Sequence, residues 1–568
     1  MNSVIGGHLL VECLIEQGCE VAFGVPGESF LAVLDGFHQH RDRIRFVSCR
    51  HEGGAAFMAE AHGKLTGRPG VCIVTRGPGA TNASIGVHTA FQDSTPMVLL
   101  VGDVGSDFRD REAFQEVDFS AFFGPGTKGL AKRVERIDAP DRIPEYIARA
   151  FATAMNGRPG PVVLVLPEDM LVQRSASKPV RRLEVPTASC TDRELHRFHE
   201  LLLQARRPLV IAGGACSPGA ARRLQTFAEA WQLPVANAFR FQDLFDNHHR
   251  LYAGDVGIGI NPKLASRIKE CDLVIALGAR LGEMTTSGYT LVESPQPRQR
   301  LIHVHASAEE LNRVYRADLP VHATMDGMLE RLAQLEAPAE VRWQDWSKAA
   351  HDDYLRNLDA QEPQGLNPQT TDVIDMPAVV AILQRRLPVD AVITNGAGNF
   401  AGWVHRYFRF HGLAKGHKTQ LAPTAGAMGY GVPAGIAANL LTGRVAFTIT
   451  GDGDFLMNGQ ELATAVQHGA KSIILLLNNG MYGTIRMHQE REYPQRTSAT
   501  DLRNPDFCAL AASYGYQSAR VVDVEGFELA LGQALESPQG MLIEIKLSPE
   551  LISTRKSLSA VTHEGLNA

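Results

Sequence analysis

Short apolar runs alternate with longer amphipathic stretches along the whole chain. Residues 71–75, 273–277 and 445–450 are examples of runs rich in valine, isoleucine and leucine. Runs of this length, each followed by helical periodicity, are typical of buried parallel strands that alternate with covering helices. The pattern therefore predicts an α/β fold built from doubly wound parallel sheets.

Two polar stretches that contain proline interrupt this alternation, at residues 171–191 and 338–368. Such stretches are typical of surface linkers. The chain of 568 residues is also too long for a single core. We therefore predict three domains, at residues 1–172, 190–338 and 368–550.

Composition excludes several classes of protein. Hydrophobic residues make up 44% of the chain and charged residues 21%, and the net charge of −6 gives no reason to expect nucleic acid as a partner. The eight cysteines form no CxxC pair, which favours reduced thiols and a cytoplasmic protein. No apolar run approaches the roughly 18 residues of a membrane span. Glu12 and Glu16 interrupt the first apolar stretch, which predicts an amphipathic helix and not a secretion signal.

The most informative motif is Gly451-Asp452-Gly453, which follows an apolar strand, with Asn478-Asn479 at the end of the next strand. Because both strands of a strand–helix–strand unit are parallel, Asp452 and Asn479 are expected at the same carboxyl edge of the sheet. Their carboxylate and carboxamide oxygens are hard ligands suited to magnesium or calcium. The glycines allow backbone N–H groups to approach a phosphate closely.

This motif resembles the magnesium and diphosphate motif of thiamine-diphosphate enzymes. The resemblance implies that Asp452, Asn479 and the backbone carbonyl of Met481 hold Mg²⁺. It also implies that Gly453 and the backbone N–H of Asp454 lie against the cofactor. The alternative is a chance glycine turn before a strand that ends in two asparagines.

The first predicted domain contains a second segment of the same resemblance, at residues 46–63. It implies that Glu52 hydrogen-bonds the aminopyrimidine ring of thiamine diphosphate and so promotes loss of the proton from C2 of the thiazolium ring. The resemblance also implies that Gly27 and Asn82 contact the cofactor. The alternative for Glu52 is an acid in the first turn of a helix, stabilised by the helix dipole.

The third predicted domain carries two further cofactor positions. Residues 425–435 are rich in glycine and alanine, and Met428 matches the apolar residue that supports the bent cofactor in this family. Asn399 matches a glutamine near the diphosphate. The alternative for Met428 is an ordinary core methionine.

The whole chain is most similar to acetolactate synthases, but several positions depart from their pattern, four of them close to the predicted active site. Arg76 replaces a serine, Glu28 a glycine, Glu168 a lysine and His488 a tryptophan linked to the choice of acceptor. The polar imidazole of His488 suggests a different acceptor or none. We expect Gln115, Tyr482 and His488 to contact the substrate; the alternative for His488 is a solvated helix residue.

The central domain bears on a second cofactor. Gly278 to Leu281 resembles a turn at which acetolactate synthases bind FAD, and Arg280 is placed to face a nucleotide. His303 and His305, however, occupy the positions of acidic residues suited to the hydroxyls of adenosine. FAD is therefore left open but disfavoured.

The resemblance implies a thiamine-diphosphate- and magnesium-dependent 2-oxoacid decarboxylase or carboligase. It also implies a homodimer or homotetramer, because the family's cofactor lies between the first domain of one subunit and the third of another. Three alternatives remain open: a flavin-dependent oxidase of pyruvate oxidase type, an acyl-CoA lyase of oxalyl-CoA decarboxylase type, and a non-catalytic binding subunit.

Overall fold

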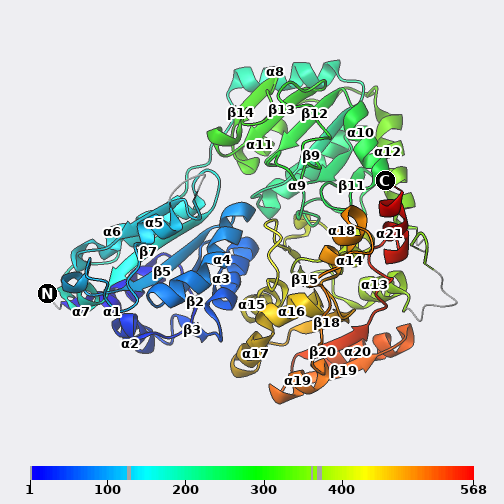
Figure 1. Ribbon diagram of the computed structural model, residues 1–568. Coiled ribbons are helices and arrows are strands. Elements are labelled where there is room, and N and C mark those ends of the chain that lie inside the picture. The colour runs from blue at the N-terminus through cyan, green and yellow to red at the C-terminus, as the bar shows by residue number, and fades with distance from the viewer. Residues whose placement is uncertain (1–2, 125–128, 360–362, 367–373, 568) are drawn as a thin grey trace.

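The computed structural model describes residues 3–124, 129–359, 363–366 and 374–567 (Figure 1). Within these residues the chain forms three six-stranded sheets, each made entirely of parallel strands. Helices cover both faces of each sheet, which confirms the predicted doubly wound α/β fold. Each sheet lies inside one of the three predicted domain ranges; the domain limits themselves stay a prediction.

The first sheet has the strand order β3-β2-β4-β5-β7-β6. Its strands are β2 (Val21–Gly24), β3 (Arg45–Ser48), β4 (Gly70–Val74), β5 (Met97–Asp103), β6 (Arg133–Arg136) and β7 (Pro161–Pro167). Apolar residues of α3 (Glu52–Thr66) and α4 (Gly77–Asp93) pack on one face. Those of α1 (Gly6–Glu16), α2 (Leu31–Gln39) and α6 (Ile143–Met155) pack on the other. The short elements here are η1 (Glu28–Phe30), α5 (Phe119–Phe123), α7 (Glu168–Val172) and the antiparallel pair β1 (Val4–Ile5) and β8 (Arg174–Ser175).

The central sheet has the order β11-β10-β9-β12-β13-β14. Its strands are β9 (Pro208–Ala212), β10 (Val235–Asn237), β11 (Tyr252–Asp255), β12 (Leu273–Leu277), β13 (Arg300–His305) and β14 (Leu319–His322). Its helices are α8 (Asp192–Gln204), α9 (Pro218–Trp231), α10 (Pro262–Glu270), α11 (Met325–Leu332) and α12 (Gln344–Leu358).

The third sheet has the order β16-β15-β17-β18-β20-β19. Its strands are β15 (Val392–Asn395), β16 (Gln420–Leu421), β17 (Ala446–Gly451), β18 (Ile473–Asn478), β19 (Gln517–Val521) and β20 (Met541–Lys546). Its helices are α13 (Met376–Arg386), α14 (Ala401–Tyr407), α15 (Gly431–Thr442), α16 (Asp452–Asn458), α17 (Leu462–His468), α18 (Gly483–Glu492), α19 (Phe507–Ser513), α20 (Val524–Glu536) and α21 (Leu558–Leu566).

The first and third domains share one apolar core, in which α3 packs against α15 (Figure 1). Phe57 and Tyr430 meet edge to face, with ring centroids 5.4 Å apart. The hydroxyl of Tyr430 donates a hydrogen bond to the buried carboxylate of Glu60. The two domains that carry the predicted cofactor residues are therefore held in direct contact within one chain.

Two helices lie outside the predicted domain ranges, α12 and α21. Part of the proposed linker at 338–368 is α12, whose residues Ala350 and Tyr354 are buried against the central sheet. This helix adds to the core of the central domain, so the polar residues around it do not mark a linker. Beyond residue 550, α21 packs against α18, and its Leu558 and Val561 are buried.

Candidate active site

The strand–turn–helix at Asp452 and the strand end at Asn479 lie side by side. Strand β17 pairs in parallel with β18, with Gly451 opposite Leu477, so both motifs leave the sheet at the same edge. The backbone N–H of Gly480 donates to Oδ2 of Asp452 at 2.8 Å, which ties the two turns together. The expected meeting of Asp452 and Asn479 at one edge is confirmed. The chain turns directly from β17 into α16, which begins at Asp452 itself, and α17 follows at Leu462–His468.

Asp452 is a buried carboxylate, 2% exposed, and no cationic side chain of the described residues pairs with it. Its oxygens accept hydrogen bonds from the backbone N–H of Gly453 and Gly480 and from the amide of Asn504. Burial raises the pKa of this carboxyl, and the hydrogen bonds counteract the rise. A buried carboxylate that lacks a cationic partner fits a bound metal ion, because an isolated buried charge is otherwise costly.

Asp454 has a structural part at the same edge. One carboxylate oxygen accepts hydrogen bonds from the backbone N–H of Ala397 and of Gly429, and the other accepts one from Thr450. Burial raises the pKa of Asp454 to about 6. The carboxylate of Asp454 therefore holds two loops around the turn, and the contact of its backbone N–H with the cofactor stays a prediction.

These turns enclose a cavity of about 270 Å³ at the carboxyl edge of the third sheet. Glycine at 453 is required here, because a Cβ would come 2.6 Å from the ring of Tyr482. The predicted site residues that line the cavity are Asn399, Met428, Asp452, Gly453, Asp454, Asn479, Met481 and Tyr482. The sequence therefore found most of the polar residues of this cavity from local motifs.

Asn399 lines the cavity, and its predicted contact with the diphosphate stays a prediction. Its side-chain amide donates to the carbonyl of Ile552 at 3.0 Å and contacts the sulfur of Met487. Its backbone N–H donates to the hydroxyl of Thr484. Asn399 thus lines the cavity but uses its amide N–H to hold neighbouring segments.

The first-domain candidates form a separate group. The amide of Asn82 donates to Oε2 of Glu52 at 2.9 Å, at the first turn of α3. The carbonyl of Gln115 accepts a hydrogen bond from Gly77, at the start of α4. None of Gly27, Glu52, Asn82 and Gln115 lines the cavity of the third domain among the described residues. The single chain therefore holds two half-sites, one on each sheet edge.

His488 also lies away from the cavity. It is exposed on α18, and its Nδ1 pairs with the guanidinium of Arg491. Burial and the charge of Arg491 lower its pKa. In this single chain His488 has the environment of a solvated helix residue, and its predicted substrate contact stays a prediction.

Sequence reasoning missed two side chains that support these half-sites. Asn504 holds Asp452, and Glu461 reaches from the third domain to accept the backbone N–H groups of Arg50 and His51 beside Glu52. Glu461 is fully buried, and burial raises its pKa. The one sequence signal for Glu461 is an acid directly before the mostly apolar helix α17. The sequence contains no signal for Asn504.

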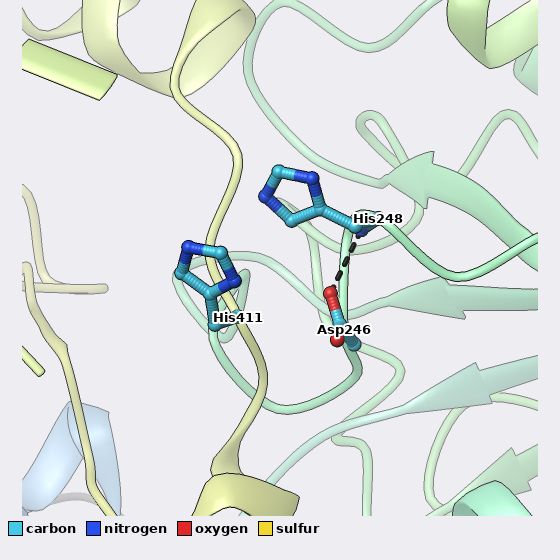
Figure 2. Close-up of side chains that lie close together, drawn as sticks. All are labelled: Asp246, His248 and His411. Atoms are coloured by element: carbon cyan, nitrogen blue, oxygen red, sulfur yellow. Dashed lines mark hydrogen bonds between the residues drawn. The ribbon is translucent and has the colours of Figure 1, made fainter. Parts of the chain in front are cut away.

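A second cluster of metal-ligating residue types lies between the central and third domains (Figure 2). The rings of His248 and His411 are stacked, with centroids 4.5 Å apart and planes 9° apart. The carboxylate of Asp246 accepts the backbone N–H of His248, and Nε2 of His248 pairs with the carbonyl of Arg409. These local bonds engage one carboxylate oxygen of Asp246 and one ring nitrogen of His248, and the stacked rings bring the loops of the two domains together.

None of the helices in the described ranges has the length and apolar character needed to cross a membrane.

The fold and the sheet-edge turns define an α/β protein with a cavity at the carboxyl edge of the third sheet, lined by the buried carboxylate of Asp452. The chain matches three family descriptions: "Thiamine pyrophosphate enzyme, N-terminal TPP binding domain" at residues 5–122, the central domain at 195–332 and the C-terminal TPP binding domain at 396–545. The chain belongs to the thiamine pyrophosphate enzyme family, and thiamine diphosphate is its cofactor.

Its curated relatives include several acetolactate synthase proteins. The chain is 31% identical to the acetolactate synthase large subunit of Corynebacterium glutamicum, over 94% of this chain and 84% of the relative. It is 30% identical to the large subunit of Lactococcus lactis, over 96% and 92% of the two chains. It is 28% identical to the isozyme 2 large subunit of Escherichia coli, over 95% of both. The resemblance inferred from motifs is therefore confirmed across nearly the whole chain.

Proposed function

We propose that this protein is a magnesium- and thiamine-diphosphate-dependent decarboxylase or carboligase of 2-oxoacids. The observation that carries the proposal is the buried carboxylate of Asp452, without a cationic partner among the described residues, beside the amide of Asn479. Asp452, Asn479 and the carbonyl of Met481 offer three oxygen ligands, which suits Mg²⁺. The similarity to acetolactate synthases supports a 2-oxoacid as the substrate.

When bound, thiamine diphosphate supplies a nucleophilic carbon and an electron sink for decarboxylation. The chain supplies orientation and proton transfer. Glycines 451 and 453 would let backbone N–H groups approach the diphosphate, and Met428, which lines the same cavity, would support the cofactor. Glu52 holds a proton at the pyrimidine ring, and its hydrogen bond from Asn82 keeps the carboxylate oriented.

We further propose that the active unit is a homodimer or a larger assembly such as a homotetramer. The two half-sites of one chain support this, because Glu52 lies on the first sheet and Asp452 on the third while the cavity is lined by third-domain residues only, among those described. A second copy would bring its Glu52 to the cavity. Exclusion chromatography coupled to light scattering measures the assembly directly.

We propose that the central domain does not require a flavin. Arg280, the expected nucleotide contact, donates to the carbonyl of Gln92 at 2.9 Å and pairs with Glu310. His303 and His305 are buried, and their ring nitrogens meet the carbonyl of Ala279 and the backbone of Ser307. An absorbance spectrum of the purified protein tests this directly.

The eight cysteines are all free thiols, which supports the cytoplasmic location predicted from their spacing.

The deciding experiment combines binding and turnover. Calorimetry with thiamine diphosphate, with and without Mg²⁺, is expected to show metal-dependent binding that Asp452→Ala abolishes. The matched control is Asp42→Ala, because Asp42 is exposed and makes no ion pair among the described residues. A screen of 2-oxoacids for carbon dioxide release then identifies the donor. Binding that is equal with and without Mg²⁺ would refute the metal site.

A further inference from the structure

Three residues that depart from the acetolactate synthase pattern lie in direct contact, although they are far apart in sequence. Nη1 of Arg76 donates to Oε1 of Glu28 at 3.1 Å, and Nη2 of Arg76 donates to Oε2 of Glu168. They follow strands β4, β2 and β7, so all three lie at the carboxyl edge of the first sheet. We call Glu28, Arg76 and Glu168 the rim triad.

The rim triad lies among the first-domain site residues. Glu28 directly follows Gly27, and Gly77, the neighbour of Arg76, donates its N–H to the carbonyl of Gln115 at 3.0 Å. A Cβ placed on Gly79, three residues after Arg76, would lie 3.6 Å from Oε1 of Glu52.

The triad also lies where the chain changes direction within the sheet. Strands β2 and β4 are neighbours, and the connections that follow them lead to opposite sides of the sheet, towards β3 and β5. In doubly wound folds, ligands bind in the crevice at this switch point. The triad therefore lies at the edge of the half-site that contains Glu52.

The charges of the triad are arranged with the cation inside and the anions outside. The side chain of Arg76 is 8% exposed, whereas those of Glu28 and Glu168 are 65% and 36% exposed. Nε of Arg76 is buried and has no hydrogen-bond partner among the described residues, so the hydrogen bonds of the guanidinium there come from its two Nη atoms, which meet the two carboxylates. The triad carries one more negative than positive charge and presents carboxylates to whatever approaches the rim.

We propose that the rim triad determines the acceptor class, by excluding a second 2-oxoacid and admitting an uncharged aldehyde. The inference deepens the proposed function and rests on it. A 2-oxoacid donor loses its carboxylate as carbon dioxide. From that step on, the carboxylates of Glu28 and Glu168 no longer repel it. An acceptor 2-oxoacid keeps its negative charge beside two carboxylates throughout, and such like-charge contacts give specificity by repulsion.

The balanced reaction follows from this choice. The donor R–CO–COO⁻ loses carbon dioxide, and the electron pair left on its carbonyl carbon forms a bond to the carbonyl carbon of the aldehyde R′–CHO. The aldehyde oxygen takes one proton. The product is the hydroxyketone R–CO–CH(OH)–R′, and no oxidant or reductant is consumed.

The test is a competition assay with the full chain, Mg²⁺ and thiamine diphosphate. The donor is the 2-oxoacid that releases most carbon dioxide, and the acceptors are acetaldehyde and 2-oxobutyrate at equal concentration. Mass spectrometry measures the ratio of the two carboligated products. The variants are Glu28→Gln, Glu168→Gln and the double variant. The matched control is Glu330→Gln, an exposed acid on α11 without an ion pair among the described residues.

The wild-type chain is expected to form mainly the aldehyde product. Each single variant should shift the ratio towards the 2-oxoacid product, and the double variant by roughly tenfold, which corresponds to about 1.4 kcal/mol of removed repulsion. Glu330→Gln should leave the ratio unchanged. Carbon dioxide release shows whether each variant is folded and active. If the double variant is misfolded and releases none, the two single variants still test the proposal.

The outcomes separate the two proposals. Carbon dioxide release with a wild-type preference for 2-oxobutyrate overturns the role of the triad and leaves the proposed function standing. The same holds if the ratio stays constant in folded, active single variants. If no 2-oxoacid releases carbon dioxide from cofactor-loaded protein, the proposed function falls and the acceptor inference falls with it.

Discussion

The side-chain amide of Asn504 donates hydrogen bonds to Oδ2 of Asp452 at 2.7 Å and to Oδ1 of Asn478 at 3.0 Å. Asn504 comes 52 residues after Asp452 in the sequence, yet it orients the carboxylate on which the proposed metal site depends. Asn504 thereby fixes the orientation of the Asp452 carboxylate, and with it the direction of the lone pairs that remain for a metal ion. We infer that Asn504 is a positioning residue, since it acts through Asp452 and not on the substrate.

Asn504→Ala is therefore expected to weaken Mg²⁺-dependent cofactor binding by about tenfold or more, since outer residues that orient a metal ligand typically contribute 10–100-fold. Calorimetric titration of Mg²⁺ at saturating thiamine diphosphate measures the effect. Higher Mg²⁺ concentration should restore turnover, which a general loss of structure would not allow. Unchanged Mg²⁺ affinity in Asn504→Ala would show that Asp452 is held without it.

Glu52→Gln should bind thiamine diphosphate with nearly unchanged affinity but lose turnover by about 10²–10⁴-fold, the usual contribution of a positioned acid or base. The amide keeps the size of the side chain and can still meet Asn82, but it cannot transfer a proton. Exchange of the C2 proton of the bound cofactor with deuterium, followed by NMR, isolates this step. Glu20→Gln is the matched control, since Glu20 is exposed and lies at the amino end of β2. Exchange at the wild-type rate in Glu52→Gln would reject the proton-transfer role.

Glu461→Ala should destabilise the contact between the first and third domains. Oε1 of Glu461 accepts the backbone N–H of His51 at 2.9 Å and of Arg50 at 3.1 Å, and alanine would leave both donors unpaired. An unpaired donor costs about 1–3 kcal/mol when it is buried, and these two hydrogen bonds are partly buried, so we expect the lower part of the combined range, a loss of about 2–4 kcal/mol in the free energy of unfolding. Urea denaturation followed by circular dichroism measures it. Gly54→Ala should cause a similar loss, because a Cβ there would come 2.5 Å from Oε1 of Glu461.

The sequence predicted those parts of the site that are built from local motifs. The glycine turn at Asp452 and the strand end at Asn479 belong to adjacent parallel strands, so their meeting follows from strand order and register. Asn504 and Glu461 could not be predicted, because their contacts depend on packing between segments that the local pattern does not relate. The stretch that holds α12 was misread because its flanking proline and glutamine residues obscured the buried Ala350 and Tyr354.

The rim triad was predicted only in part: its residues were found in the sequence, but their contacts were not. Glu28, Arg76 and Glu168 were each recognised as departures from the family pattern, but a single sequence gives no pairing between them. The structure explains why they occur together: an arginine 8% exposed needs carboxylates within reach, and a glutamate at 168 in place of lysine supplies one. The three exchanges therefore form one unit in the folded chain.

His305 lies at the end of β13, where the family pattern has an acid, and we expect it to reduce the stability of the fold in acid. Burial and, to a smaller extent, the neighbouring ring of His303 lower the pKa of His305 to about 4, from an ordinary value of 6.5. Glu310 opposes this shift, while Arg158 adds to it. Because the folded chain binds this proton less readily than the unfolded chain, a fall in pH from about 6.5 to about 4 reduces the free energy of unfolding. The shift corresponds to a loss on the order of 3 kcal/mol over that window.

His305→Asn removes this titration and keeps a side-chain acceptor for the backbone N–H of Ser307, which now donates to Nδ1 of His305 at 3.0 Å. At neutral pH the variant is expected to be the less stable protein, because it loses some packing. Near pH 5 or below, the urea midpoints of the wild type and the variant should become similar. The difference in stability between them should move in favour of the variant as the pH falls from 7.5 to 4.5. Parallel pH profiles for the two proteins would mean that His305 does not contribute to acid unfolding, whatever the size of the offset between them.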